Sequence, residues 1–145
     1  MNILIGVGND MRGDDAIGPY VARRLKCKGW LAIDCGTAPE NFLSVIRKAE
    51  PETVVIVDSA EMGLKPGDIR KIPKEKIGLL TLSTHSIPLS LLAEYIENFA
   101  QRVIIVGIQP ANMEFGSEMC DAVKKAGETL IKIIERSAVD EIKEV

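Results

Sequence analysis

The amino-acid sequence predicts an α/β fold, because short β-branched runs alternate along the chain with segments whose apolar residues recur at helical spacing. One run, Thr-Val-Val-Ile-Val at residues 53–57, is continuous and is typical of a central parallel strand covered on both faces. The chain has 145 residues and is 46% hydrophobic, which suits one domain with one core. We therefore expect residues 1–145 to form a single domain.

Strands are expected wherever short apolar runs lie between turn residues. The expected strands are residues 3–5, 31–34, 53–57, 69–72 and 103–106. Residues 69–72 alternate between apolar and charged side chains, as an edge or hairpin strand does. Residues 77–82 are expected as a strand or an extended loop.

Helices are expected between these strands. The expected helices are residues 14–26, a segment that begins at Pro39 and ends before Pro51, a segment introduced by Ile87-Pro88, and residues 117–136. Pro19 is compatible with the first helix because proline is tolerated in a first turn. Ser117 is expected as the N-cap of the last helix, and the charged residues 137–145 are expected to fray or to extend that helix.

Charge and composition exclude several classes of protein. The net charge is -3, and acidic and basic residues are interspersed, which argues against a nucleic acid as the main partner. No apolar run approaches the roughly 20 residues that span a bilayer, and the N-terminus lacks the basic region of a signal peptide, so we expect a cytoplasmic protein. Three cysteines without CxxC spacing predict neither a disulfide framework nor a zinc knuckle.

Acidic residues follow two of the expected strands. The first strand leads through a glycine-rich loop to Asp14 and Asp15, and the strand at residues 53–57 ends at Asp58. The only histidine, His85, lies in the loop before an expected helix. Because the carboxyl ends of parallel strands meet at one edge of a sheet, these groups can converge there. Two carboxylates and an imidazole suit a divalent metal such as nickel, zinc, cobalt or manganese better than copper(I).

Each of these residues also has a structural interpretation. Asp14 or Asp15 can be an N-cap that satisfies backbone N–H groups at the start of a helix. Asp58 can form an Asx-turn, although an acid directly after five β-forming residues is costly near a core unless a polar group pairs with it. His85 can be a hydrogen-bonded loop residue.

Other catalytic chemistries have weaker support. Gly6-Val7-Gly8 begins like a dinucleotide fingerprint, but Met11 stands where its third glycine belongs, and the acids of the loop would repel a pyrophosphate. The sequence has neither a GxxxxGK[ST] phosphate loop nor a GxSxG nucleophile elbow. A cysteine or serine triad would have to use His85, and nothing selects Cys35 or another residue as its nucleophile.

Three motifs together resemble those of the hydrogenase maturation endopeptidases. They are Gly6-x-Gly8-Asn9-x-x-x-Gly13-Asp14-Asp15-Ala16-Ile17-Gly18, Val55-Ile56-Val57-Asp58-Ser59-Ala60 and Ser83-Thr84-His85, in the same order and at similar spacing. A further segment, Gly107-Ile108-Gln109-Pro110, is similar to the branch that matures the large subunit of hydrogenase 3 and related hydrogenases.

This resemblance implies a fold and a site. The implied fold is a three-layer α/β/α sandwich on a twisted, mostly parallel five-stranded sheet. The implied nickel ligands and catalytic residues are Asp15, Asp58 and His85, and Asp14 would support them or cap the helix. Gly36 and Thr37 would border the peptide groove, unless Gly36 is only a turn glycine.

The resemblance also implies an activity. Such an endopeptidase removes the C-terminal extension of a [NiFe]-hydrogenase large-subunit precursor after nickel insertion, with the nickel supplied by the substrate and replaceable by other divalent metals. The attacking water is activated either by the metal, which lowers its pKa to about 7, or by Asp15 or Asp58 as general base. We expect the precursor as partner, no membrane insertion, and a monomer.

Two other classes of function stay open at the level of sequence. One is a nickel-binding accessory protein of hydrogenase assembly that docks on the large subunit without cutting it. The other is a small-ligand-binding α/β domain in which the acids coordinate magnesium.

Overall fold

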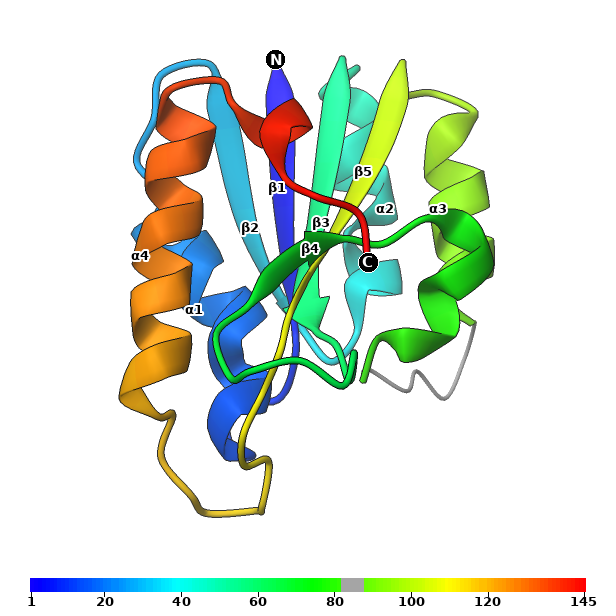
Figure 1. Ribbon diagram of the computed structural model, residues 1–145. Helices are drawn as coiled ribbons and strands as arrows, with labels where there is room; N and C mark the ends of the chain where they lie inside the picture. The colour runs from blue at the N-terminus through cyan, green and yellow to red at the C-terminus, as the bar shows by residue number, and fades with distance from the viewer. Residues whose placement is uncertain (82–87) are drawn as a thin grey trace.

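The computed structural model describes residues 1–81 and 88–145 and has the predicted α/β arrangement (Figure 1). The strands are β1 (Asn2–Val7), β2 (Trp30–Gly36), β3 (Thr53–Ser59), β4 (Ile69–Lys71) and β5 (Arg102–Ile108). The α-helices are α1 (Ile17–Arg24), α2 (Leu43–Lys48), α3 (Leu89–Glu97) and α4 (Asp121–Glu135). Short 3-10 helices are η1 (Gly13–Ala16), η2 (Pro39–Phe42), η3 (Lys74–Leu79) and η4 (Val139–Glu141).

The strands form a five-stranded sheet in the order β2-β1-β3-β5-β4. β1 pairs in parallel with β2 and β3, and β3 pairs in parallel with β5. Only β4, among the described strands, runs antiparallel to its neighbour β5. The mostly parallel sheet is therefore confirmed, with the short β4 at one edge, as the alternating pattern of residues 69–72 indicates.

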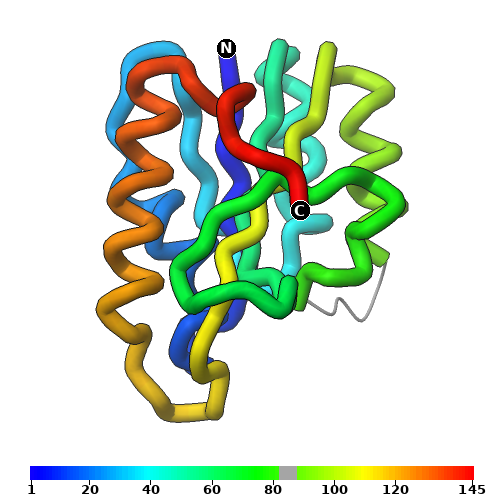
Figure 2. Tube along the Cα trace, viewed as in Figure 1, coloured from blue at the N-terminus to red at the C-terminus, as the bar shows by residue number. Residues whose placement is uncertain are grey.

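Helices cover both faces of this sheet, with α1 and α4 on one side and α2 and α3 on the other (Figures 1 and 2). Alternate residues of β1 show why: Ile3 and Ile5 pack in a core with residues of α2 and α3, whereas Leu4 packs in a second core with residues of α1 and α4. β3 divides in the same way and has no exposed residue in its centre. Two separate apolar cores thus hold the three-layer α/β/α sandwich together.

Two glycines allow α1 to lie directly against the sheet. A Cβ on Gly18 would stand 2.2 Å from the carbonyl oxygen of Val7 and 2.5 Å from that of Val57. A Cβ on Gly6 would stand 2.1 Å from the carbonyl oxygen of Gly18. These contacts leave no room for a side chain, so the glycines set the distance between β1 and α1 and, with it, the position of the acids that precede α1.

The strand order places a topological switch point between β1 and β3. The chain leaves β1 through α1 and enters β2, which is the neighbour of β1 on one side. It then passes through α2 and enters β3, which is the neighbour of β1 on the other side. Ligands of open α/β sheets bind in the crevice at such a point, outside the carboxyl ends of the strands. Asp15 follows β1, and Asp58 stands near the end of β3, so both lie at this edge.

Several helix boundaries differ from those predicted. The segment at residues 14–26 begins as the 3-10 helix η1 and ends earlier, at Arg24. Ser117 does not cap the last helix, which begins at Asp121 after Cys120; its hydroxyl donates to the carbonyl of Glu114 instead. α4, the longest described helix, has 15 residues, and no helix within residues 1–81 and 88–145 is long and apolar enough to cross a membrane.

Residues 77–82 were expected to be extended, but the part that the structure describes is mostly helical. η3 covers residues 74–79, and only Leu80 forms an isolated bridge, with Ala60. Lys76 and Leu80 donate to carbonyls three residues before them, as in a 3-10 turn. This local bonding replaces the sheet ladder that the apolar residues of the segment suggested.

The charged C-terminal segment neither frays nor extends α4. Ser137 has a φ of +57°, which ends the helical path, and Ala138, Val139 and Ile142 are buried. Glu144 then forms a parallel bridge with Lys71 of β4. The segment therefore packs along the outer side of β4, where Val139 and Ile142 join one core and Val145 packs against the other.

Candidate active site

Asp15 lies in η1, immediately before α1, and only 2% of it is exposed. Its Oδ1 accepts hydrogen bonds from the hydroxyls of Ser59 (2.7 Å) and Thr81 (2.9 Å). Its Oδ2 accepts one from the backbone N–H of Asn9 (3.1 Å). These three donors, all within the described part of the chain, fix the orientation of Asp15.

Asp58 lies near the end of β3 and is fully buried. Its Oδ1 accepts a hydrogen bond from the backbone N–H of Ser59 (2.8 Å). Ser59 therefore joins the two acids: its amide donates to Asp58 and its hydroxyl donates to Asp15. The structure thus brings together two carboxylates that are 43 positions apart in sequence, as the parallel sheet predicts.

Two hydroxyl residues complete this arrangement, and sequence reasoning did not select either of them. The hydroxyls of Ser59 and Thr81 lie in direct contact, and the Thr81 amide donates to the carbonyl of Ser59 (3.0 Å). Ser59 follows Asp58 directly, so the sequence alone indicates that Ser59 lies near the site. Thr81 was not identifiable in this way, because the bonds that bring it to Asp15 are tertiary.

His85 lies outside the described residues, as do all residues from 82 to 87. Thr81, four positions before it, is held at the site by its bonds to Asp15 and Ser59. Within residues 1–81 and 88–145, no group of three or more His, Cys, Asp or Glu side chains is arranged to hold a metal. The assignment of His85 as a ligand with Asp15 and Asp58 stays a prediction.

Asp14 points away from Asp15 into a different set of partners. One of its oxygens, Oδ2, accepts the backbone N–H groups of Ala111 (2.7 Å) and Asn112 (2.9 Å), and Oδ1 accepts that of Cys120 (2.8 Å). Neither η1 nor α1 has a side-chain cap hydrogen bond, so helix capping is the wrong interpretation of Asp14 and Asp15. Asp14 is a buried anchor for the loop that follows β5.

Gln109 anchors a second loop at the same edge of the sheet. It is 4% exposed, and its Oε1 accepts the N–H groups of Met62 (2.7 Å) and Leu64 (3.3 Å). Its Nε2 donates to Glu61 Oε2 (2.5 Å). The loop that follows β3 is thereby tied to the end of β5, which restricts its movement beside the acids.

Cys35 and Gly36 are the last two residues of β2, and Thr37 follows the strand. Burial, with smaller effects of Asp34 and Glu40, raises the pKa of the Cys35 thiol to about 12. A thiol with so high a pKa is protonated near neutral pH and is not an activated nucleophile. Gly36 has a φ of +54°, and its carbonyl accepts the N–H of Gly8 (2.9 Å), so it is a turn glycine that also ties β2 to the loop after β1.

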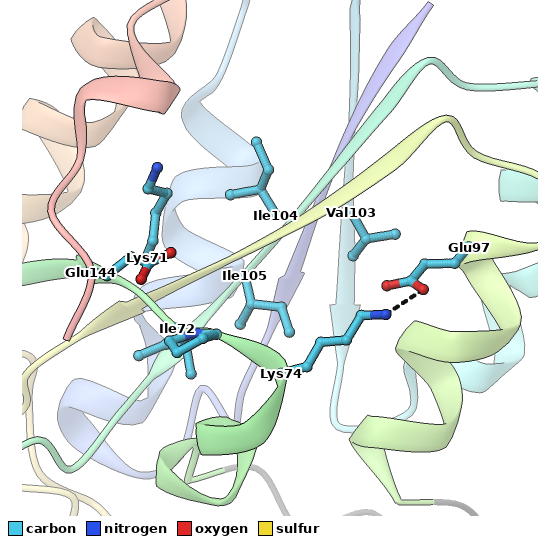
Figure 3. Close-up of a pocket in the computed structure, with 9 residues that line it drawn as sticks. Lys71, Ile72, Lys74, Glu97, Val103, Ile104, Ile105 and Glu144 are labelled. Atoms are coloured by element: carbon cyan, nitrogen blue, oxygen red, sulfur yellow. Dashed lines mark hydrogen bonds and ion pairs between the residues drawn. The ribbon is translucent and has the colours of Figure 1, made fainter.

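A pocket of about 220 Å³ lies elsewhere, along the first half of β5 (Figure 3). Val103 and Ile105 line it from β5, and Lys74 reaches across from η3 to form an ion pair with Glu97 of α3. Asp15 and Asp58 do not line this pocket. The pocket and the acids therefore belong to opposite halves of the strands.

Comparisons with known proteins show which family the chain belongs to. The sequence model of the hydrogenase maturation protease family matches residues 17–137. The chain is 39% identical over 138 residues to the hydrogenase 3 maturation protease of Escherichia coli, with 92% of this chain and 88% of that protein covered.

Solved structures give the same result. The solution structure of the endopeptidase HycI from Escherichia coli superposes with a TM-score of 0.90 at 35% identity, over 99% of this chain and 96% of that one. The crystal structure of a [NiFe] hydrogenase maturation protease from Thermococcus kodakarensis gives 0.82 at 32% identity, over 94% and 91%. The chain therefore belongs to the hydrogenase maturation protease family, and its enzyme class is that of a peptidase.

Proposed function

We propose that this protein is a nickel-gated endopeptidase that removes the C-terminal extension from the precursor of a [NiFe]-hydrogenase large subunit. The observation that carries the proposal is the convergence of two buried carboxylates, Asp15 and Asp58, on Ser59 at the switch point of the sheet. Family membership supplies the reaction class, and one similar structure is named as a [NiFe] hydrogenase maturation protease.

Nickel belongs to the substrate in this proposal. The precursor holds the metal through its own cysteine thiolates, and Asp15, Asp58 and His85 approach it as additional oxygen and nitrogen ligands. A precursor without nickel lacks this anchor, so its scissile bond is not held at the site. Because correct positioning is worth up to roughly 7–11 kcal/mol of a barrier in favourable cases, loss of the anchor is sufficient to prevent cleavage.

The chain itself contributes orientation and proton transfer. Three hydrogen bonds hold Asp15 in one orientation, and the amide of Ser59 orients Asp58. One of these carboxylates takes a proton from the attacking water as the water oxygen bonds to the peptide carbonyl carbon. The carbon–nitrogen bond then breaks, and the proton passes to the departing amine. Hydrolysis consumes one water and leaves a shortened subunit and a free peptide.

The test is to incubate the purified protein with nickel-loaded and with nickel-free precursor and to determine the masses of the products. The proposal predicts a shortened subunit and a released peptide from the loaded precursor alone. Equal cleavage of both precursors would contradict nickel gating. Binding of the loaded precursor without any cleavage would instead support a nickel-binding accessory protein. An absence of both binding and cleavage would favour a small-ligand-binding domain.

A further inference from the structure

Two adjacent loops beside the site expose large apolar side chains. Met11, in the loop after β1, is 55% exposed, and Phe115, in the loop after β5, is 75% exposed. Met113, in the same loop as Phe115, is partly buried and contacts Ser59. We call Met11, Met113 and Phe115 the Met–Phe rim. Single exposed apolar residues are common, but two on neighbouring loops beside a site form a candidate binding surface.

The two loops are joined along their backbones. The N–H of Gly116 donates to the carbonyl of Met11 (2.7 Å), and the guanidinium of Arg12 donates to the carbonyl of Met113 (3.2 Å). The N–H of Asp14 donates to the carbonyl of Asn112 (2.9 Å). Met11 and Phe115 are therefore held near each other, although they are 104 positions apart in sequence. Figure 1 shows the loop after β5 extending beyond the carboxyl edge of the sheet.

The buried carboxylate of Asp14 fixes the loop of Met113 from below. It accepts N–H groups at both ends of the loop, from Ala111 and Asn112 on one side and from Cys120 on the other. Hydrogen bonds to a carboxylate are stronger than those between neutral groups, so the loop is preorganised. A preorganised surface loses less conformational freedom when it binds a partner.

The rim is continuous with the proposed site. The sulfur of Met113 lies 3.6 Å from the hydroxyl of Ser59, the group that also donates to Asp15. Met113 thus connects the loop that carries Phe115 to the hydroxyl that bonds Asp15. The thioether side chain is flexible and polarisable, and it adapts to apolar groups of different shape.

We propose that the Met–Phe rim binds the apolar side chains next to the scissile bond of the precursor. This inference rests on the proposed function, because it assigns the rim to the same substrate. The occupant is an extended peptide segment rather than a second folded domain, since the surface consists of three side chains that continue directly into the site. The Met–Phe rim contributes affinity for the precursor and sets which peptide bond lies at the acids, and the acids contribute to hydrolysis of that bond.

The experiment measures kcat and KM for nickel-loaded precursor with the wild-type protein and with the double variant Met11→Ser/Phe115→Ser. Both residues are exposed, so the fold is retained, which a thermal melt verifies. The inference predicts a rise in KM of about tenfold with kcat within about twofold, because the variant removes binding that is equal in ground state and transition state. Phe115→Leu keeps an apolar side chain and is predicted to retain most of the affinity.

Leu31→Ser is the matched control, because Leu31 is also an exposed apolar residue, 37% accessible, but lies at the start of β2 at the opposite end of the sheet. It is predicted to leave KM unchanged. An unchanged KM in the double variant, with the wild-type protein active, would overturn the inference and leave the proposed function intact. If the wild-type protein cleaves no precursor, the affinity of each variant for nickel-loaded precursor is measured by calorimetry instead. Equal affinities of the wild-type protein and the double variant would overturn the inference. A weaker affinity of the double variant would support it.

Discussion

A carboxylate at the end of an apolar strand is costly unless polar groups surround it. Asp58 is fully buried, yet its Oδ1 accepts the amide of Ser59, and the Ser59 hydroxyl faces Asp15. The protein thus maintains two adjacent acids in a place where an apolar residue would stabilise the fold more simply. Such an arrangement is expected where the acids serve a reaction rather than stability.

Substitution of either acid tests this at the level of residues. Asp58→Asn and Asp15→Asn are each predicted to lower the rate of precursor cleavage by about 100-fold or more, because a neutral amide is neither a base nor a good metal ligand. Circular dichroism is predicted to show a retained fold. Asp121→Asn, an exposed acid at the start of α4, is the control. Normal cleavage by Asp58→Asn would remove Asp58 from the site.

Cys35 gives a second prediction at this scale. Its pKa of about 12, which burial raises, keeps the thiol protonated at pH 8 in the native protein. Iodoacetamide is therefore predicted to modify the partly exposed Cys27 of the native protein and to modify Cys35 only after denaturation, as peptide mass mapping can show. Rapid native modification of Cys35, or loss of cleavage in Cys35→Ser, would contradict an inert role.

The contact between α1 and the sheet sets the geometry of the site at the level of elements. Gly18→Ala is predicted to destabilise the protein by about 1–3 kcal/mol or more, because the new methyl group meets two backbone carbonyls that cannot move independently. Urea unfolding measures this change. Gly78→Ala is the matched control, since a Cβ there has no atom within 4 Å and its backbone does not adopt a positive φ. Equal stabilities of the two variants would show that α1 can move away from β1.

The C-terminal segment gives a prediction about the whole molecule. Arg102 of β5 donates to both carboxylate oxygens of Asp140 (2.8 and 3.1 Å), and this hydrogen bond lowers the pKa of Asp140 below its ordinary 3.8. A lowered folded-state pKa means that the pair stabilises the fold above pH 3.8 and that this stabilisation is lost as the pH falls through the lower value.

Asp140→Asn is therefore predicted to cause a small loss of stability at pH 7 that shrinks at pH 3, measured as the difference in urea midpoint from wild type. The loss is small because the pair is exposed and solvent screens it. A loss that is equal at both pH values would indicate that packing of the segment, rather than the ion pair, carries the effect.

Local pattern sufficed for much of the architecture. The continuous run at residues 53–57 predicts a central parallel strand, and β3 occupies the centre of the sheet with parallel strands on both sides. The pattern failed where tertiary contacts decide. The C-terminal segment leaves the helix because its apolar residues fit a core, and the apolar residues 77–79 form a 3-10 helix because local hydrogen bonds were available to them.

The same distinction applies to the candidate site. Asp15 follows the first strand through a loop and Asp58 ends the strand at residues 53–57, so the direction of parallel strands predicts that both lie at one edge of the sheet. The role of Asp14 was not predictable, since its partners Ala111, Asn112 and Cys120 are about 100 positions away in sequence. The position of Thr81 beside Asp15 was not predictable for the same reason. His85 stays a prediction that rests on the resemblance of its motif.

The ratio of initial cleavage rates on nickel-loaded and nickel-free precursor tests the central claim most directly. The account predicts that wild-type protein cleaves the loaded precursor at least about 100-fold faster, because the metal positions the scissile bond. It also predicts that Asp15→Asn and Asp58→Asn lose this preference together with activity. Equal rates on the two precursors with wild-type protein would contradict the account.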